Sequence, residues 1–435
     1  MSKSPSKTTV KSGLWQVLTT PRLLPTAMAH GFIEIPYFIF PTILLLIQKQ
    51  FNLDDWQIGL IGAGPMLLSG LIAPFAGLLC DRIKKTTLIS LTLVLSAFGN
   101  VVIGIFGDTL LALIIGIGIL GITISFYHPA GFGLISQTEL NNRSFMFAIH
   151  GIGGTLGASL GPLSVGLLIV RLNYLWQKIY MVWAVPLFGY ALFYKMMMHS
   201  FKGETTSRAK QKIKSSTLPI IEKTQSISQI NQVMTRGLFL LVTFMALLAL
   251  GRGSLNFFLP AFLFESKGIP IAAAAFFYSS LPLFGIFGQM IGGFVSDKTS
   301  EKVIIEVFMI LQTVTIILIY FIKMKLVLLG TFCLFGAVSS ALWPVTASLT
   351  AQSSTERNRG AAYGIYMAPQ NILGAIAPTI GGFLKGISYS WLFGFASLLN
   401  MSGIVTIHLF SEKTAIVPFH CPSFNRQNNN YSNKL

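Results

Sequence analysis

Gly77-Leu78-Leu79-Cys80-Asp81-Arg82 closes one long apolar segment of the chain, and Gly293-Phe294-Val295-Ser296-Asp297-Lys298 closes another, 216 positions later. That offset is about half of the 435 residues. A glycine followed four positions on by an aspartate and a cation occurs by chance, but a second copy at the half-length spacing indicates an internal duplication. In a chain built from apolar segments, two duplicated halves are typical of membrane transporters.

The composition of the chain is that of a membrane protein. Hydrophobic residues make up 53% and charged residues only 10% of the sequence, and the mean hydropathy is +0.68. Such a chain cannot cover a water-exposed surface with polar groups. Because a bilayer core needs about 20 apolar residues per helix, we predict an all-α membrane protein of twelve transmembrane helices in two pseudo-symmetric six-helix bundles. The predicted spans are 23–48, 57–79, 86–106, 110–135, 144–170, 177–198, 237–264, 271–295, 302–322, 326–350, 360–386 and 390–410.

Basic residues give the chain a formal net charge of +17, a value also found in nucleic-acid-binding proteins. Their positions indicate membrane topology instead. If both termini are cytoplasmic, 23 of the 31 lysines and arginines fall in the inside segments and seven in the outside loops, as the positive-inside rule requires. We therefore expect a multi-pass protein of the cell inner (plasma) membrane, embedded in the lipid bilayer, with no nucleic-acid partner. The three cysteines suggest no disulfide framework.

Changes in composition also divide the chain into segments. Between about Phe201 and Arg236, lysine, serine, threonine and glutamine replace the apolar runs. This composition suits a cytoplasmic linker, with a short surface helix around Ile220–Val233. We predict a cytoplasmic N-terminal segment (1–22), an N-terminal six-helix bundle (23–200), the linker (201–236), a C-terminal six-helix bundle (237–410) and a cytoplasmic tail (411–435).

Further landmarks recur at the same offset of 216 positions. They are Asn142-Arg143 with Asn358-Arg359, Pro162 with Pro378, and Gly166 with Gly382. Over about residues 23–410 these landmarks resemble the major facilitator superfamily. The loop that begins at Gly77 is similar to that superfamily's signature Gly-x-x-x-Asp-Arg-x-Gly-Arg-Arg, except that Lys84 stands where the family has glycine.

The resemblance implies a latch that holds the two halves together on the cytoplasmic side. The residues expected in this cytoplasmic gate are Gly77, Asp81, Arg82, Asp297, Lys298, Arg143 and Arg359. The carboxylate of Asp81 would lie near the C-terminal end of its helix, where the helix dipole is unfavourable, so it should seek a cation or a helix N-terminus. The alternative is that these charges are only solvated topology signals.

Small residues recur at a spacing of four in the fifth span, at Gly157 and Gly161, followed by Pro162. This spacing lets helices approach closely, and the proline removes a backbone donor. The string resembles the helix-5 signature of the superfamily's drug antiporters, and Pro378 and Gly382 form a partner copy in the eleventh span. The alternative is tight packing with no bearing on the direction of transport.

Two charged residues lie inside predicted spans, Glu34 in the first and Arg252 in the seventh. Such residues are functional candidates by default. Aligning Pro41 with Pro260 places Glu34 opposite Gly253, next to Arg252, so we expect the two charges to face each other at a central site. Glu34 would carry a coupling proton, and Arg252 would attract an anionic substrate or neutralise Glu34. The alternative is a buried salt bridge that closes the cavity.

Three histidines lie near this expected site. His30 precedes Glu34 by four residues, on the same helical face, and would share its proton or serve only in packing. His128 and His150 lie towards the cytoplasmic ends of spans 4 and 5 and would line the inner mouth. Because these groups lack the paired spacing of a zinc site, we expect no metal, and no cofactor beyond a proton gradient. Asn256 would contact the solute or bond to a neighbouring helix.

Short strings in the first half resemble one branch of the superfamily more closely. They are His30-x-x-x-Glu34, Phe40-Pro41, Trp56–Ile61, Tyr127-His128-Pro129 and Gly153–Leu163. These strings look like the fosmidomycin-resistance branch, whose members are efflux proteins, and the resemblance implies export, with proton antiport. The fourth span contains no arginine, whereas many proton-coupled drug exporters of the superfamily carry one there.

We therefore expect a monomeric secondary transporter that exports a small solute or drug-like compound by proton antiport through alternating access. Proton-coupled uptake of a small organic anion or metabolite is the alternative within the same class. A non-transporting membrane sensor or receptor is the alternative from another class. A membrane enzyme is not expected, because no nucleophile, base and oxyanion donors converge, and no P-loop sequence indicates direct ATP drive.

Overall fold

The structure is a computed structural model, and it describes residues 22–136, 143–172, 174–200, 235–296, 299–353 and 359–410. These residues form twelve α-helices, six in each half of the chain. The helices of the first half are α2 (Leu23–Phe51), α3 (Asp55–Arg82), α4 (Lys85–Phe106), α5 (Leu110–Ser136), α6 (Arg143–Leu172) and α7 (Trp176–Ser200). Those of the second half are α10 (Arg236–Glu265), α11 (Ile271–Ser296), α12 (Glu301–Phe321), α13 (Lys325–Gln352), α14 (Arg359–Ile387) and α15 (Tyr389–His408).

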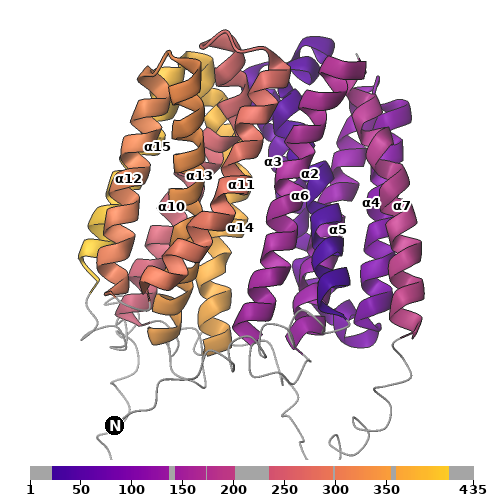
Figure 1. Cartoon of the computed structure of the whole chain (residues 1–435), viewed down its shortest axis with the longest axis horizontal. Coiled ribbons are helices and arrows are strands. Elements are labelled where there is room, and N and C mark those ends of the chain that lie inside the picture. Colours follow the sequence, from indigo (N-terminus) through magenta and orange to yellow (C-terminus); the bar gives the residue numbers. More distant parts are fainter. Residues whose placement is uncertain are drawn as a thin grey trace, which may run out of the picture.

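The twelve helices form two groups that lie side by side (Figure 1), with α2–α7 in indigo to magenta and α10–α15 in salmon to yellow. In the first group α2 packs against α6, and α4 packs against α5 and α7; in the second, α10 packs against α14 and α15, and α11 against α13. The groups meet along two seams, α3 against α14 and α6 against α11. The predicted fold class, twelve helices in two six-helix bundles, is confirmed.

Helix length and side-chain exposure both suit a bilayer. Ten of the described helices are long and apolar enough to cross a membrane, and α3 and α14 are of similar length, with 28 and 29 residues. Large apolar side chains are exposed on the outside of the bundles, with Leu71 77%, Val185 74% and Leu326 73% accessible. A surface of this kind suits contact with lipid rather than with water.

Glycines bring α6 directly onto α2. A Cβ atom on Gly157 would collide with the carbonyl oxygen of Gly31, and one on Gly161 with the carbonyl oxygen of Ile35. The predicted helix-packing residues of the fifth span therefore face α2 of the same bundle. Their close approach places the functional side chains of α2 next to those of α5 and α6.

The predicted linker lies between α7, which ends at Ser200, and α10, which begins at Arg236. The surface helix expected around Ile220–Val233 lies outside the described residues, as do the segment 1–21 and the tail 411–435.

Candidate functional site

A cavity of about 430 Å³ lies between the two bundles and is lined by residues of α2, α3, α5 and α7 from the first half and of α10, α11, α13 and α14 from the second. α2 passes it with two prolines, Pro36 and Pro41. Each proline removes a backbone donor, so the hydrogen-bond ladder of α2 is interrupted twice beside the cavity. The location at the interface of the two repeats is where transporters of this architecture hold their solute.

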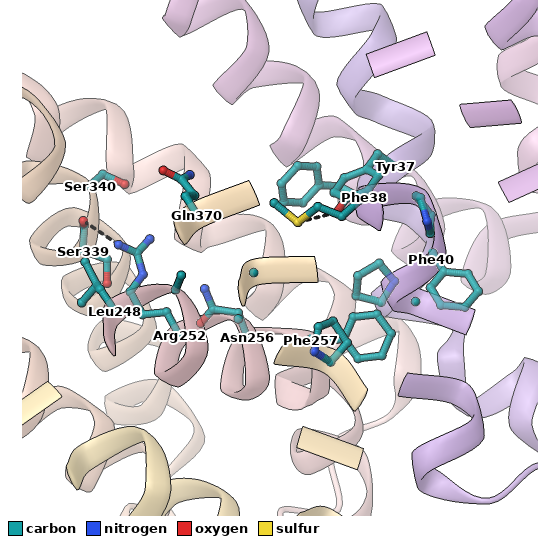
Figure 2. A pocket seen from close by; sticks show the side chains of 18 of the residues that line it. Tyr37, Phe38, Phe40, Leu248, Arg252, Asn256, Phe257, Ser339, Ser340 and Gln370 are labelled. Atoms are coloured by element: carbon teal, nitrogen blue, oxygen red, sulfur yellow. Dashed lines mark hydrogen bonds between the residues drawn. The ribbon is translucent and has the colours of Figure 1, made fainter. Parts of the chain in front are cut away.

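The second bundle supplies the polar side of the cavity, and Arg252 supplies its positive charge (Figure 2). The guanidinium Nη1 donates a hydrogen bond to the carbonyl oxygen of Ser339, at 3.2 Å. Among the residues that the structure describes, no carboxylate pairs with Arg252. Asn256 lies one turn further along α10, and Gln370 comes from α14. The buried Oδ1 atom of Asn256 has no hydrogen-bond partner within the described part of the chain.

The first bundle supplies an aromatic side. Tyr37, Phe38 and Phe40 of α2 line the cavity, and Phe257 of α10 lies beside them, with ring centroids of Phe40 and Phe257 5.9 Å apart. In Figure 2 these rings lie together at one end and the Arg252 guanidinium at the other. The cavity is therefore amphipathic, with one cationic end and one aromatic end.

Glu34 does not pair with Arg252, and the sequence-based expectation that the two charges face each other is wrong. The Glu34 Oε1 atom instead lies 3.3 Å from His30 Nε2 and 3.7 Å from His128 Nε2. The reason is that His128, on α5, lies on the same side of α2 as Glu34. The carboxylate therefore has two histidines of the first bundle beside it, His30 and His128. Glu34 and Arg252 thus form two separate sites.

The hydrogen bonds around His30 determine its protonation. Its Nδ1 atom lies 2.9 Å from the backbone carbonyl oxygen of His150. A carbonyl oxygen only accepts, so Nδ1 carries a proton and donates. The Nε2 atom then faces Glu34 Oε1 at 3.3 Å, and one proton between them, on the imidazole or on the carboxyl group, makes this contact favourable. His30 and Glu34 are therefore placed to share one exchangeable proton.

Tyr127 and His150 hold this pair from behind. The Tyr127 hydroxyl donates to the carbonyl oxygen of Thr26 at 2.6 Å, so it accepts from His150 Nε2 at 3.1 Å. The His150 ring stacks on His30 with centroids 4.4 Å apart. His150 is fully buried, so its predicted place in the inner mouth is wrong; glycines on α6 allow this helix to bring His150 into the interior. His128 is about one third exposed.

Gly154 of α6 provides the space for the His30 ring. A Cβ atom at this position would collide with the imidazole, 2.6 Å from its Nδ1 and Nε2 atoms. From the sequence, this glycine is one of the small residues of the fifth span that allow close helix packing. The order of residues does not show that a histidine ring of another helix fills the space beside it.

An ion network that the sequence did not predict joins the bundles at the end where α3 begins and α14 ends, which we call the Asp55 end. The Lys385 Nζ atom lies 2.6 Å from Asp55 Oδ1 of the other bundle and 3.1 Å from Glu265 Oε2. Gln48 donates to Asp55, and Tyr389 to Glu265. From the sequence alone, Lys385 counts only as a charge of an outside loop, because neither acid lies near it along the chain.

Close packing supports the network at the Asp55 end. A Cβ atom on Gly382 would collide with the carbonyl oxygen of Asp55, and the rings of Trp56 and Phe383 stack with centroids 5.8 Å apart. A Cβ on Gly59 would meet the carbonyl of Pro378. The predicted packing residues of the eleventh span therefore lie at the seam between the bundles, and the structure is closed at the Asp55 end.

The predicted cytoplasmic gate falls largely outside what the structure describes. Asp297 and Lys298 lie outside the described residues, and the side chains of the other gate residues, apart from the exposed Arg82, are not described: they are Asp81, Arg143 and Arg359. Gly77 lies within α3. The latch therefore stays a prediction.

Sequence comparison agrees with this architecture. The profile of the Major Facilitator Superfamily matches the chain over residues 26–337 and 247–418. The chain belongs to the Major Facilitator Superfamily. A solved structure of the superfamily fold, a bacterial homologue of the human lysosomal transporter Spinster in an inward-facing and occupied conformation, covers 94% of this chain and 95% of its own, with a TM-score of 0.68 and 15% identity.

Two relatives of this superfamily member have names that refer to a small molecule. The benzoate transport protein of Acinetobacter baylyi is 23% identical over 419 residues, which cover 87% of each chain. The fosmidomycin resistance protein of Escherichia coli is 26% identical over 146 residues, about one third of each chain. The predicted resemblance to the superfamily is thus confirmed, and the similarity to the fosmidomycin-resistance branch covers a limited part of the chain.

Proposed function

We propose that the chain is a proton-coupled transporter of small organic anions. The observation that carries this proposal is Arg252, which lines the central cavity and has no carboxylate partner among the described residues. A cation shielded from water is unfavourable without a counter-charge, and a bound anion supplies one. The similarity to a benzoate transport protein supports the same class of solute.

The two ends of the cavity suggest how such an anion binds. Its carboxylate would accept hydrogen bonds from the Arg252 guanidinium and from the amide of Asn256, while an apolar or aromatic body would lie against Tyr37, Phe38 and Phe257. The volume of about 430 Å³ is within the range of sites for small molecules. Gln289 and Gln370 also line the cavity and would contribute further polar contacts.

Glu34 and His30 are the proposed proton site, because their contact requires one shared proton. Glu34 precedes the cavity residue Tyr37 by three positions and so lies on the same face of α2, but it does not itself line the cavity. An anion at Arg252 and a proton at Glu34 therefore occupy different places. Simultaneous occupancy favours movement of both in the same direction.

Charge arithmetic supports uptake as the direction. Entry of a monoanion into a cell against the membrane potential costs about 2.3 kcal/mol for every 100 mV. One proton that moves in with the anion cancels this cost. Export by proton antiport, which the sequence favoured, is the second candidate, and the similarity to the fosmidomycin resistance protein supports it.

The cellular setting follows from the charge distribution. We propose that the protein lies in the cell inner (plasma) membrane as a monomer with both termini in the cytoplasm. The Asp55 end, at which α2 finishes, would then face the outside of the cell. The structure would represent a state that is closed to the outside, and solute exchange would require the halves to rock about the seams.

The test is transport by the full-length protein in proteoliposomes with an imposed pH gradient. Labelled benzoate is the probe, and an acidic exterior should drive its accumulation inside the vesicles. Arg252→Gln should abolish this accumulation. Benzyl alcohol, which has the ring without the charge, should not compete with the probe.

Two outcomes separate the candidates. Depletion of benzoate from the vesicles under the same gradient would support the antiporter. Saturable binding of benzoate without any flux would support the sensor or receptor and would overturn the transport proposal.

A further inference from the structure

We propose that His30, Glu34 and His128 form a binding site for a divalent transition-metal ion of the zinc class. The three residues each offer one ligand atom, and these atoms all lie within 4.8 Å of one another. Two imidazoles and one carboxylate are a ligand set that zinc uses in sites with an open fourth position. The sequence-based expectation of no metal rested on spacing along the chain, and the tertiary structure removes that objection because α5 brings His128 to the pair on α2.

The separations between the ligand atoms suit a metal centre. Ligands of a tetrahedral zinc ion at about 2.0–2.1 Å lie about 3.3–3.4 Å from one another. The contacts from Glu34 Oε1 to His30 Nε2 and His128 Nε2 are 3.3 and 3.7 Å. The ligand atoms of His30 and His128 lie within 4.8 Å of each other, so a small inward movement of His128 completes the geometry, and its side chain is the least buried of the three.

The surroundings of His30 have the form of a second coordination shell. Its Nδ1–H donates to the carbonyl oxygen of His150 at 2.9 Å, which directs the Nε2 lone pair towards Glu34. Metal-bound histidines almost always donate their other N–H to a carbonyl or carboxylate in this way. The ring also packs against those of His150 and Tyr127, with centroids at 4.4 and 5.3 Å, so its orientation is fixed before a metal binds.

An orphaned atom in His128 is a second, independent observation. Its Nδ1 atom is buried and has no hydrogen-bond partner among the residues that the structure describes. A neutral imidazole needs a donor or acceptor for each nitrogen, and burial of an unpaired nitrogen is costly. Rotation of the ring about its Cβ–Cγ bond can present either nitrogen to the centre of the three residues. Exposure of about one third of this side chain leaves a path for the ion and for a water molecule as fourth ligand.

Metal and proton would exclude each other. Coordination requires an ionised Glu34 and an unprotonated Nε2 on His30, so binding of the ion displaces the proton that the pair shares. This part of the inference rests on the proposed function, in which that proton is the coupling ion. A zinc-class ion would therefore inhibit proton-coupled flux.

The binding test uses purified full-length protein in detergent and needs no transport. Co²⁺ is the probe, because its visible absorption bands report tetrahedral coordination, and Zn²⁺ should abolish them at one ion per chain. His128→Asn should weaken the affinity by about tenfold or more and remove the bands. The matched control is His408→Asn, because His408 lies 3.1 Å from Glu306 in an exposed pair to which no described residue adds a third ligand; this variant should bind like the parent.

Absence of saturable Co²⁺ bands, or bands that persist unchanged in His128→Asn, would overturn the metal site. Should Glu34→Gln or His30→Asn fail to fold, His128→Asn still tests the site, since its side chain is only partly buried. In proteoliposomes, Zn²⁺ should inhibit the parent and the His408 control at the same concentration. If Zn²⁺ binds but does not inhibit transport, the mutual exclusion of metal and proton is overturned. If the protein shows no pH-driven flux even without metal, the proposed function is overturned, but the metal-binding site is not.

Discussion

The Lys385 Nζ atom on α14 lies 2.6 Å from Asp55 Oδ1 on α3, so a buried ion pair joins the two bundles at one end of the molecule. The Lys385 side chain is only 6% exposed and also contacts Glu265 of its own bundle. An opening of the bundles at this end must separate Lys385 from Asp55. The pair therefore stabilises the closed state relative to the open one.

Asp55→Asn should increase the population of states that are open at the Asp55 end. Loss of a charge-assisted hydrogen bond of this kind shifts an equilibrium by about tenfold or more. The readout is reaction of a single cysteine at the cavity residue Met66 with a membrane-impermeant maleimide added outside, in a background that lacks the native cysteines. Lys178→Met removes an exposed lysine of the first bundle as a control, and an equal labelling rate in both variants would contradict the role of the pair.

Arg252→Lys should retain the positive charge but lose the planar guanidinium. That group donates a hydrogen bond to the Ser339 carbonyl oxygen and, in the proposed function, also binds the solute. We expect the apparent affinity for benzoate to fall by about tenfold, and Arg252→Gln to remove binding altogether. Isothermal titration with the purified protein gives both values. If Arg252→Gln binds benzoate as the parent does, the anion site lies elsewhere.

Glu34→Gln should separate coupling from solute movement. The amide cannot share a proton with His30, so pH-gradient-driven accumulation should be lost, while exchange of labelled for unlabelled benzoate across the membrane should continue. Both are measured in the same proteoliposomes. A variant that still accumulates solute under the gradient removes Glu34 from the coupling role.

Tyr127→Phe should destabilise the first bundle, although this side chain does not contact the solute. The hydroxyl is the hydrogen-bond partner of both the Thr26 carbonyl and the buried His150 Nε2, and leaving them unpaired costs about 1–3 kcal/mol. Thermal unfolding in detergent should therefore begin at a lower temperature. Tyr37→Phe is the comparison, since the Tyr37 hydroxyl makes only a 4.0 Å contact to the Met66 sulfur, and it should leave the unfolding temperature close to that of the parent.

Gly157→Ala should loosen the contact of α6 with α2. The added methyl group would collide with the Gly31 carbonyl, and overpacking of this type costs about 1–3 kcal/mol. Gly151→Ala on the same helix is the matched control, because a Cβ there meets no described atom within 4 Å and alanine favours the helix. Equal unfolding temperatures for the two variants would show that the helix seam tolerates the methyl group.

Much of the architecture followed from local properties of the chain. A transmembrane helix satisfies its own backbone groups and is recognised by a run of apolar residues, so the number of helices and their division into two bundles needed no knowledge of distant contacts. Gly157 and Gly161 indicated close packing for the same reason, since small residues at a spacing of four lie on one face of a helix.

Only part of the site could be predicted from the sequence in this way. Glu34, His30 and Arg252 could be identified because ionisable residues are rare inside spans. The partners of these residues could not be identified. Aligning two spans by their prolines predicts how deep a residue lies in the membrane, but not the direction in which its side chain points around the helix axis. Rotation placed Glu34 towards His128 and Arg252 towards Ser339.

The sequence by itself determined a duplicated, twelve-helix membrane protein and the few charges that lie within it, because hydropathy and repetition are properties of the order of residues. Only the tertiary structure decided which groups meet: His128 with the His30–Glu34 pair, Lys385 with Asp55, and Arg252 with no carboxylate in the described part of the chain. The physical reason is that these contacts join helices far apart in the chain, and close packing of glycines against neighbouring backbones helps to set how helices such as α6 and α14 are turned.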